Sequence, residues 1–196
     1  VTQGAASLFA TTRARLEREA ARATALDAGA FLSSLEVRCV VRVERDASRA
    51  GRVSELLRRT NQFVTTARRP SAAELASLMG RDGAAVISLH VRDRFADYGL
   101  VGAAVVEGTA VTALAVSCRV IGLEVEIPLL RRALESAGRD GAAVRVLFAP
   151  TERNLPARRL FVLPGFSTLA DGSGYCYDLA CHTPPADPTH LRVIEE

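Results

Sequence analysis

The stretch with the most specific chemistry is the loop at 116–126, VSCRVIGLEVE, in which an apolar run meets Arg119 and Gly122. An Arg-x-x-Gly turn between a strand and a helix suits a phosphate, because the helix N-terminus offers unpaired N–H groups and glycine allows close backbone approach. Arginine adds a charge-assisted donor. The residues expected to hold the phosphate of a cofactor are Arg119, Val120, Ile121 and Gly122.

The same loop carries residues that disfavour a bound phosphate. The carboxylate of Glu124 would lie against the phosphate oxygens, with Glu126 close behind it. Like charges a few Å apart cost on the order of 1–4 kcal/mol, depending on the local dielectric. Pro128 also removes one N–H from the first helical turn. Acidic residues and proline are, however, favoured in the first turn of any helix, so the sequence leaves both interpretations open.

Two further side chains have the chemistry of a nucleophile and of a general base. Cys118 adjoins Arg119, which would stabilise a thiolate together with a following helix N-terminus; the alternative is a small buried apolar residue. His90 shares one face of an alternating stretch with Ser88 and Arg92, and histidine titrates near neutral pH. Its alternative is an ordinary strand residue on a polar face. Cys118 and His90 are therefore candidate catalytic residues.

Three side-chain amides are candidates for ligand contacts. Asn61 and Gln62 end an expected helix, where their amides would orient the amide groups of a ligand or close the helix C-terminus. Asn154 precedes another expected helix, where it would position a ligand or cap the helix. The sequence does not decide between these roles.

The composition restricts the class of protein. The 196 residues are 48% hydrophobic and 24% charged, with a formal net charge of +3, which gives little reason to expect a nucleic-acid partner. No apolar run approaches ~18 residues, so no membrane span is expected. Four cysteines in a chain of this length do not make a disulfide framework, which indicates a reducing, cytoplasmic setting. Cys176, Cys181 and His182 lack the spacing of a zinc site, so no metal is expected.

These candidates are positioned by an expected succession of strands and helices. Apolar alternation and apolar runs predict seven strands, at 37–43, 85–92, 100–106, 111–116, 142–148, 167–170 and 175–180. Helical spacing and capping signals predict helices at 5–28, 49–61, 71–80, 127–136 and 154–163. The order indicates a mixed α/β layered fold with a sheet of about seven strands. The expected parts are an N-terminal helix or linker at 1–30, a domain at 31–182 and a flexible tail at 183–196.

Several dispersed motifs carry a family resemblance. The strand–loop–helix at 111–136, with Arg119-x-x-Gly122, resembles the acyl-CoA loop of the GNAT acyltransferase superfamily. The pattern Asn154-x-x-Ala157-x-x-x-Phe161-x-x-x-Gly165-Phe166 is similar to a later helix motif of that superfamily. The segments that together resemble the C-terminal GNAT-like domain of FkbH-like proteins are FLSSLEV (31–37), RRTNQFVTTARR (58–69), RDRFADYGLVG (92–102) and SCRVIG (117–122).

The resemblance implies a GNAT-like mixed sheet and a role in polyketide or related natural-product biosynthesis. Family members load a glyceryl unit onto the phosphopantetheine arm of an acyl carrier protein, with the loading chemistry in a haloacid-dehalogenase-like partner domain. By the resemblance, a phosphopantetheine thioester, on the carrier protein or as acyl-CoA, lies between the strands at 100–106 and 111–117 and the splayed strand at 142–148. Asp97 and Tyr98 would contact its acyl group, although Asp and Gly at this point also fit a simple turn.

Phe161 departs from this family pattern. Many GNAT enzymes have a tyrosine general acid at the corresponding position, and phenylalanine cannot donate a proton. This argues against ordinary acetyl transfer from CoA and leaves two hypotheses. The first is an acyltransferase-type domain that acts on a carrier-linked thioester. The second is a non-catalytic docking module, in which an acidic carrier-protein helix meets arginines such as Arg58, Arg59, Arg68 and Arg69.

Overall fold

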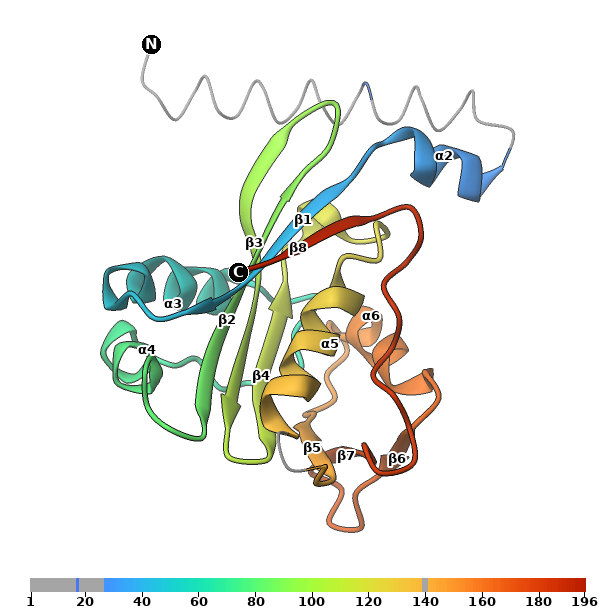
Figure 1. Ribbon diagram of the computed structural model, residues 1–196. Helices are drawn as coiled ribbons and strands as arrows, with labels where there is room; N and C mark the ends of the chain where they lie inside the picture. The colour runs from blue at the N-terminus through green and yellow to red at the C-terminus, as the bar shows by residue number, and fades with distance from the viewer. Residues whose placement is uncertain (1–16, 18–26, 139–140) are drawn as a thin grey trace.

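The computed structural model describes residue 17 and residues 27–138 and 141–196 (Figure 1). The helix expected at 5–28 lies almost wholly outside these residues. The helices are α2 (Ala28–Ser34), α3 (Ala50–Arg59), α4 (Ala72–Leu78), α5 (Glu126–Ala137) and α6 (Leu155–Arg158), with 3-10 turns η1 (Ala47–Arg49), η2 (Cys118–Val120) and η3 (Arg159–Val162). The strands are β1 (Arg38–Glu44), β2 (Ala84–Arg92), β3 (Asp97–Glu107), β4 (Ala110–Val116), β5 (Val144–Leu147), β6 (Phe166–Thr168), β7 (Gly174–Tyr177) and β8 (Arg192–Glu195).

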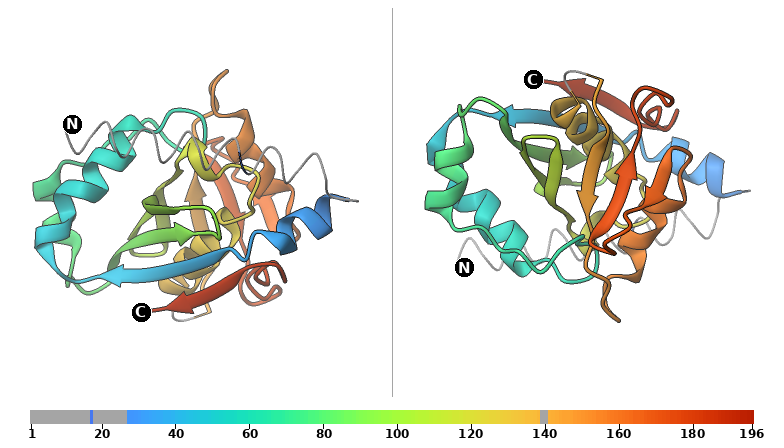
Figure 2. Two further views of the ribbon diagram at one scale, coloured as in Figure 1. Left: turned by 90° about the horizontal axis from the view of Figure 1, so that it is seen from above. Right: turned by 90° about the horizontal axis from the view of Figure 1, so that it is seen from below.

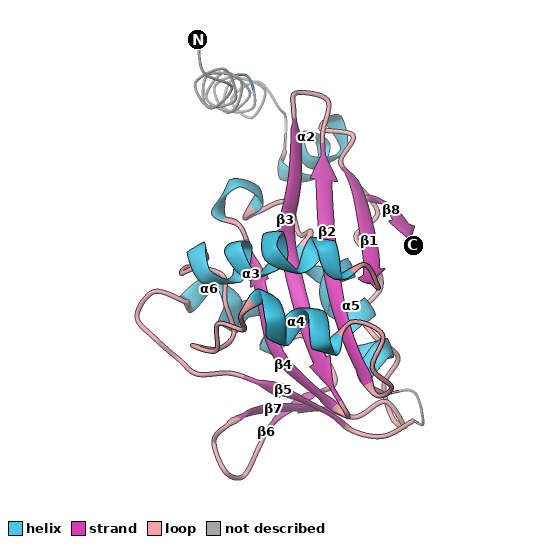
Figure 3. Ribbon diagram, turned by 90° about the vertical axis from the view of Figure 1, so that its left-hand side faces the viewer, coloured by secondary structure: helices cyan, strands magenta, loops and turns pink. Residues whose placement is uncertain are grey.

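The described strands form one eight-stranded mixed sheet in the order β6-β7-β5-β4-β3-β2-β1-β8. The pairs β4–β5 and β1–β8 are parallel, and the other neighbours are antiparallel. Helices flank the sheet on both sides, with α3 and α4 over one face and α5 over the other (Figures 2 and 3). This confirms the mixed α/β layered fold expected from the sequence, with one strand more than predicted.

The two faces of the sheet bury different side chains, because successive strand residues point to opposite sides. On β2, Ile87 and Leu89 belong to the core beneath α5, whereas Val86 belongs to the core beneath α3 and α4. The α3 and α4 side is lined by small residues of β3 and β4, namely Ala103, Ala113 and Ala115. Small side chains let α3 approach the backbone of the sheet closely. The candidate site lies at the end of α3.

The expectation of a flexible tail at 183–196 is wrong. β8 pairs in parallel with β1, from Arg38↔Arg192 to Val41↔Glu195. The backbone of Glu196 continues the pairing, because its oxygen accepts from Val43 N at 3.0 Å. The tail is rich in proline and aspartate, which suggested a loose end, but its last residues cover the otherwise open edge of β1. The sheet therefore continues past residue 182, where the domain was expected to end, and includes the terminal strand β8.

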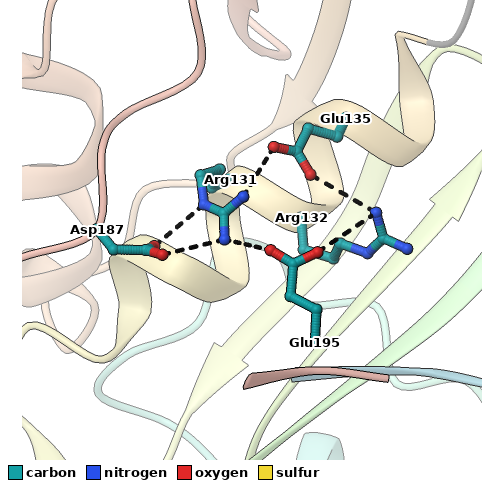
Figure 4. A network of polar contacts seen from close by, with 5 residues as sticks. All are labelled: Arg131, Arg132, Glu135, Asp187 and Glu195. Carbon is teal, nitrogen blue, oxygen red and sulfur yellow. Dashed lines mark hydrogen bonds and ion pairs between the residues drawn. The ribbon is translucent and has the colours of Figure 1, made fainter. Parts of the chain in front are cut away.

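A network of ion pairs fastens this terminal segment to α5 (Figure 4). Arg131 donates to Asp187 at 3.0 and 3.1 Å, to Glu135 at 3.0 Å and also to Glu195. Arg132 lies 3.6 Å from Glu135 and 3.8 Å from Glu195. The side chain of Arg131 is only 19% exposed, so this network is better shielded from water than an ordinary surface pair.

Local signals predict the start of one helix correctly, and a second helix has the expected extent but a mixed type. Ser71 Oγ accepts from Glu74 N at 3.2 Å, and Ser71 N donates to Glu74 Oε2 at 2.7 Å, so the predicted capping box of α4 is confirmed. The helix expected at 154–163 is instead one α turn, α6, followed directly by η3. The core positions of this segment are Ala157, Leu160 and Phe161.

Candidate functional site

β4 and β5 diverge after two paired positions. Their ladder contains only Ala110↔Arg145 and Val111↔Val146, so the rest of β4 has no partner in β5. In the sequence-based hypothesis, a phosphopantetheine thioester enters such a gap.

The gap is filled by the chain itself, at residues 63–66. Val116 N donates to Phe63 O and Thr65 N to Leu114 O, both at 2.9 Å, around an isolated bridge between Val64 and Ala115. On the far side, Ala149 N donates to Thr65 O at 2.8 Å. Residues 63–66, which we call the plug, therefore form a short strand between β4 and the chain that follows β5.

Asn154 holds the plug in place. Its side-chain Nδ2 donates to Val64 O and to Ala149 O, both at 2.9 Å, and its Oδ1 accepts from Thr151 N at 2.8 Å. The residue is 1% exposed and its side chain makes no capping bond to α6. The expected role of Asn154 in cofactor binding is therefore corrected, because its amide is fully used in holding two separate stretches of backbone.

The loop at 116–126 also differs from the expected phosphate site. α5 begins at Glu126, so Gly122 lies before the helix N-terminus rather than on it. Val120 is completely buried in the core, and Ile121 packs against that core. Val120 N donates to Ser117 O and Leu123 N to Val120 O, both at 3.2 Å. The N–H groups of Val120 and Leu123 therefore serve the loop itself, and the side chains of Val120 and Ile121 serve the core, so the role that the structure shows for both residues is structural, in place of the expected phosphate contact.

The first turn of α5 holds a carboxylate of its own. Burial raises the pKa of Glu126 above its usual 4.5, against a hydrogen bond from its own backbone N–H, and Glu124 raises it further. Glu124 adopts φ 60° and is exposed, with Oε2 3.7 Å from His190 Nδ1. His190 Nε2 in turn lies 3.1 Å from Leu123 O. The terminal segment and two glutamates therefore surround the helix end at which a phosphate was expected.

A groove of about 1110 Å³ opens at the same end of the sheet. Its walls come from the end of α3 and the residues after it, the start of β3, the turn η2, and the loop before α6. In the view from above, the chain after α3 extends from that helix toward the α6 side of the sheet (Figure 2). The candidate residues that line this groove are Asn61, Gln62, Tyr98, Cys118 and Arg119.

Four of these five present an exposed side chain. Asn61, Gln62, Cys118 and Arg119 are all exposed, and Arg119 Nε donates to Ser117 Oγ at 3.3 Å. Tyr98 differs, because its residue is buried and its hydroxyl donates to Asp93 Oδ2 at 3.0 Å. The phenol of Tyr98 is therefore bonded to the loop between β2 and β3, and the expected contact of Tyr98 with an acyl group stays a prediction.

Asp97 and His90 lie outside the lining of the groove. Asp97 Oδ1 accepts from Gly99 N at 2.8 Å, which is the turn role that the sequence left open. His90 is half-buried on β2, opposite Val40 and Leu100. Burial lowers the pKa of His90 below 6.5, and Arg42 lowers it further, so the ring is neutral at pH 7. Neither residue is placed to act on a ligand in the groove.

The groove has an excess of positive charge. Its lining contains four arginines, Arg52, Arg59, Arg119 and Arg153, against two glutamates, Glu55 and Glu152. Glu55 lies 3.6 Å from Arg52 and 3.0 Å from Arg59, and so neutralises part of one wall. Arg153 makes no ion pair within the part of the chain that the structure describes. Sequence reasoning missed Arg52 and Arg153, because only the fold brings them to the same opening.

The arginines expected to meet a partner divide into two groups. Arg68 pairs with Glu107 and donates to Thr112 Oγ1 at 2.9 Å, and Arg69 donates to Thr66 O at 2.6 Å and Thr60 O at 3.2 Å. These two stabilise the chain on either side of the plug. Arg58 and Arg59 are exposed at the end of α3, and Arg59 lines the groove.

Phe161 is part of an aromatic cluster. Its ring stacks on Tyr175 with centroids 4.0 Å apart and meets Phe148 edge-on at 5.0 Å and Phe166 at 5.3 Å. The ring is buried and serves packing, which agrees with the absence of an acid at this position.

No group of three or more His, Cys, Asp or Glu side chains in the described residues could hold a metal ion. Across the same residues, no helix is both long and apolar enough to cross a bilayer. No protein-family model matches the chain, and no curated protein matches its sequence significantly.

Proposed function

We propose that this chain is a GNAT-like binding domain for an acyl carrier protein in natural-product biosynthesis, and that the groove takes the carrier's phosphopantetheine arm. The observation that carries the proposal is the gathering of Asn61, Gln62, Cys118 and Arg119 on one groove with an excess of arginine. The family resemblance adds a glyceryl-type acyl group and a haloacid-dehalogenase-like partner domain.

The chemistry of the groove matches the three parts of the arm. Arg119 and Arg153 offer planar donors to the single phosphodiester. Asn61 and Gln62 offer donors and acceptors to the two amide groups of pantetheine. Cys118 adds an exposed thiol to the lining of the groove.

Two features favour a carrier-linked arm in the groove over acyl-CoA between the strands. The plug satisfies the free edge of β4 with backbone bonds, so a pantetheine chain would have to displace buried Val64 and Thr65. The carboxylates of Glu124 and Glu126 at the start of α5 disfavour the several phosphates of CoA. Together with Phe161, these features support a binding module more than a conventional acetyltransferase.

Acyl transfer through Cys118 is the second candidate, because the Cys118 thiol is exposed in the groove. In this step the Cys118 thiolate attacks the thioester carbonyl, and the carbon–sulfur bond to pantetheine breaks. The acyl group remains on Cys118, and the pantetheine thiolate takes up the proton that Cys118 released. A mass increase of the chain by one acyl group, lost in Cys118→Ser, would support this candidate; a wild-type chain that stays unmodified would exclude it.

The binding proposal is tested by Arg119→Ala, with Arg45→Ala as the matched control. Arg45 is exposed, lies outside the groove and makes no hydrogen bond or ion pair within the described residues. We expect Arg119→Ala to weaken binding of a phosphopantetheine-loaded carrier protein about tenfold, as for loss of a charge-assisted hydrogen bond, and Arg45→Ala to leave binding unchanged. If the two variants have equal affinity for the loaded carrier and equal thermal stability, the groove does not bind the phosphopantetheine arm.

A further inference from the structure

The outer face of residues 155–162 combines apolar and basic side chains. α6 and η3 follow each other directly, and this short helical segment turns Ala157, Leu160 and Phe161 into the core. Its exposed positions follow the spacing i, i+3, i+4 and i+7, which places them on one side of a helix. These positions are Leu155, Arg158, Arg159 and Val162.

The exposure of the apolar pair is unusual for this protein. Leu155 is 58% exposed and Val162 is 83% exposed, and among the described residues Ile194 is the one other exposed large hydrophobic residue. Single exposed apolar residues are common, but two on one helical side, flanked by arginines, make a small amphipathic surface. We call Leu155, Arg158, Arg159 and Val162 the α6 face.

Part of the charge of the α6 face has no partner among the described residues. Arg158 and the adjacent Arg153 make no hydrogen bond or ion pair within the part of the chain that is described, whereas Arg159 interacts electrostatically with Glu126. On α3, Glu55 pairs with Arg52 and Arg59, and on β3, Glu107 pairs with Arg68 and Arg81. Carboxylates of a partner would therefore pair with Arg158 and Arg153 without displacing an ion pair.

We propose that the α6 face docks an acidic amphipathic helix of the carrier protein whose arm enters the groove. Arg153 belongs to the groove lining and stands two residues before Leu155, so the α6 face begins next to one wall of the groove. One α turn and one 3-10 turn separate Leu155 from Val162, about 10–12 Å along the axis, which is comparable to the spacing of apolar side chains seven apart on a partner helix. Arg158 and Arg159 lie between them and face carboxylates of that helix. This inference rests on the proposed function and specifies its partner surface.

The test separates the carrier body from its arm. The binding partners are an acidic carrier protein without its arm, the same protein with its arm, and 4′-phosphopantetheine alone. Val162→Ser and Arg158→Glu remove the apolar and the basic component of the face, and both sites are exposed, so folding is not at risk. The matched controls are Ile194→Ser and Arg45→Glu, which change exposed residues away from the groove.

We expect Val162→Ser and Arg158→Glu each to weaken binding of the arm-less carrier about tenfold, as for loss of a central contact residue. Neither variant changes binding of 4′-phosphopantetheine, which Arg119→Ala weakens instead. The effect of Arg158→Glu shrinks as salt is raised, because exposed charges are screened.

Each contrary outcome has a distinct meaning. If wild type, Val162→Ser and Arg158→Glu all bind the arm-less carrier equally well, the α6 face is not the docking surface. The proposed role of the groove is unaffected by that result. Binding of the loaded carrier alone, with none of the arm-less form, overturns the α6 face in the same way. Absence of binding for all three partners overturns the proposed function together with this inference.

Discussion

A single residue, Asn154, holds the plug in the gap between β4 and β5. Asn154→Ala leaves the buried carbonyls of Val64 and Ala149 without their donor. We expect a loss of about 2–4 kcal/mol in the free energy of unfolding, because each unsatisfied buried group costs about 1–3 kcal/mol. Urea unfolding measures the loss. The exposed Asn61→Ala is the control and should stay within about 0.5 kcal/mol of wild type. Equal stability of the two variants would show that Asn154 does not hold the plug.

Glu126 gives a residue-scale prediction that depends on pH. Burial raises the pKa of Glu126 in the folded chain above its usual 4.5, so the folded state binds the proton more tightly than the unfolded state. Stability is therefore lost as pH rises from 4.5 through the folded pKa, and the deficit persists at pH 7. We expect Glu126→Gln to be more stable than wild type at pH 7, with the difference vanishing below pH 4.5. A gain for Glu126→Gln that is the same at every pH would contradict the account.

The sequence predicts residue identities in the site better than residue roles. Asn61, Gln62, Cys118 and Arg119 were chosen from the chain alone, and the fold brings all four to one groove. For Asn154 the sequence predicts a ligand contact or a helix cap, because the residue precedes α6, whereas its side chain binds backbone carbonyl groups. The carbonyl groups that its side chain binds come from Val64 and Ala149, one of them 90 residues away, and no local pattern reports such a contact.

At the scale of elements, the terminal strand depends on Arg131. Arg131→Met keeps the aliphatic stem but leaves Asp187 and Glu195 without their main partner. We expect about 1–3 kcal/mol less stability and faster hydrogen exchange at the amides of β8, because a charge-assisted contact from a largely shielded arginine is lost. Arg132→Met is the matched control, since its contacts with Glu135 and Glu195 are longer, and its effect should be smaller. Equal exchange rates in the two variants would mean that the network does not fasten β8.

Elements with strong local periodicity were predicted well, and elements held by distant contacts were not. β2 and α5 follow from alternation and helical spacing, and α4 from its capping box. β8 was missed because it pairs in parallel with β1, more than 150 residues earlier, after a connector rich in proline. The plug was missed for the same reason, since residues 63–66 form a strand only where β4 and β5 diverge.

On the scale of the whole molecule, the sheet has two distinct ends. At one end β4 and β5 still pair, whereas at the other the plug, η2, the end of α3 and the loop before α6 surround the groove. The groove is therefore assembled from four regions that are far apart in the chain. The sequence indicates several residues of the candidate site, but it does not show that residues 63–66 fill the gap between β4 and β5.

The central claim is that the carrier's arm lies in the groove, and the four cysteines allow a direct measurement. Cys118 and Cys181 are both exposed, but only Cys118 lines the groove, and Cys39 is buried. A carrier protein whose phosphopantetheine arm ends in a bromoacetyl group would be incubated with the chain, and the modified cysteine identified by mass spectrometry. We predict that the ratio of Cys118 to Cys181 alkylation is at least about tenfold higher with this carrier than with free bromoacetamide, and that the excess falls in Arg119→Ala, because docking raises the local concentration of the electrophile. The hydrogen bond with Asp178 raises the pKa of the Cys181 thiol and slows its reaction with both reagents alike. An equal ratio of Cys118 to Cys181 alkylation with the two reagents would contradict the claim.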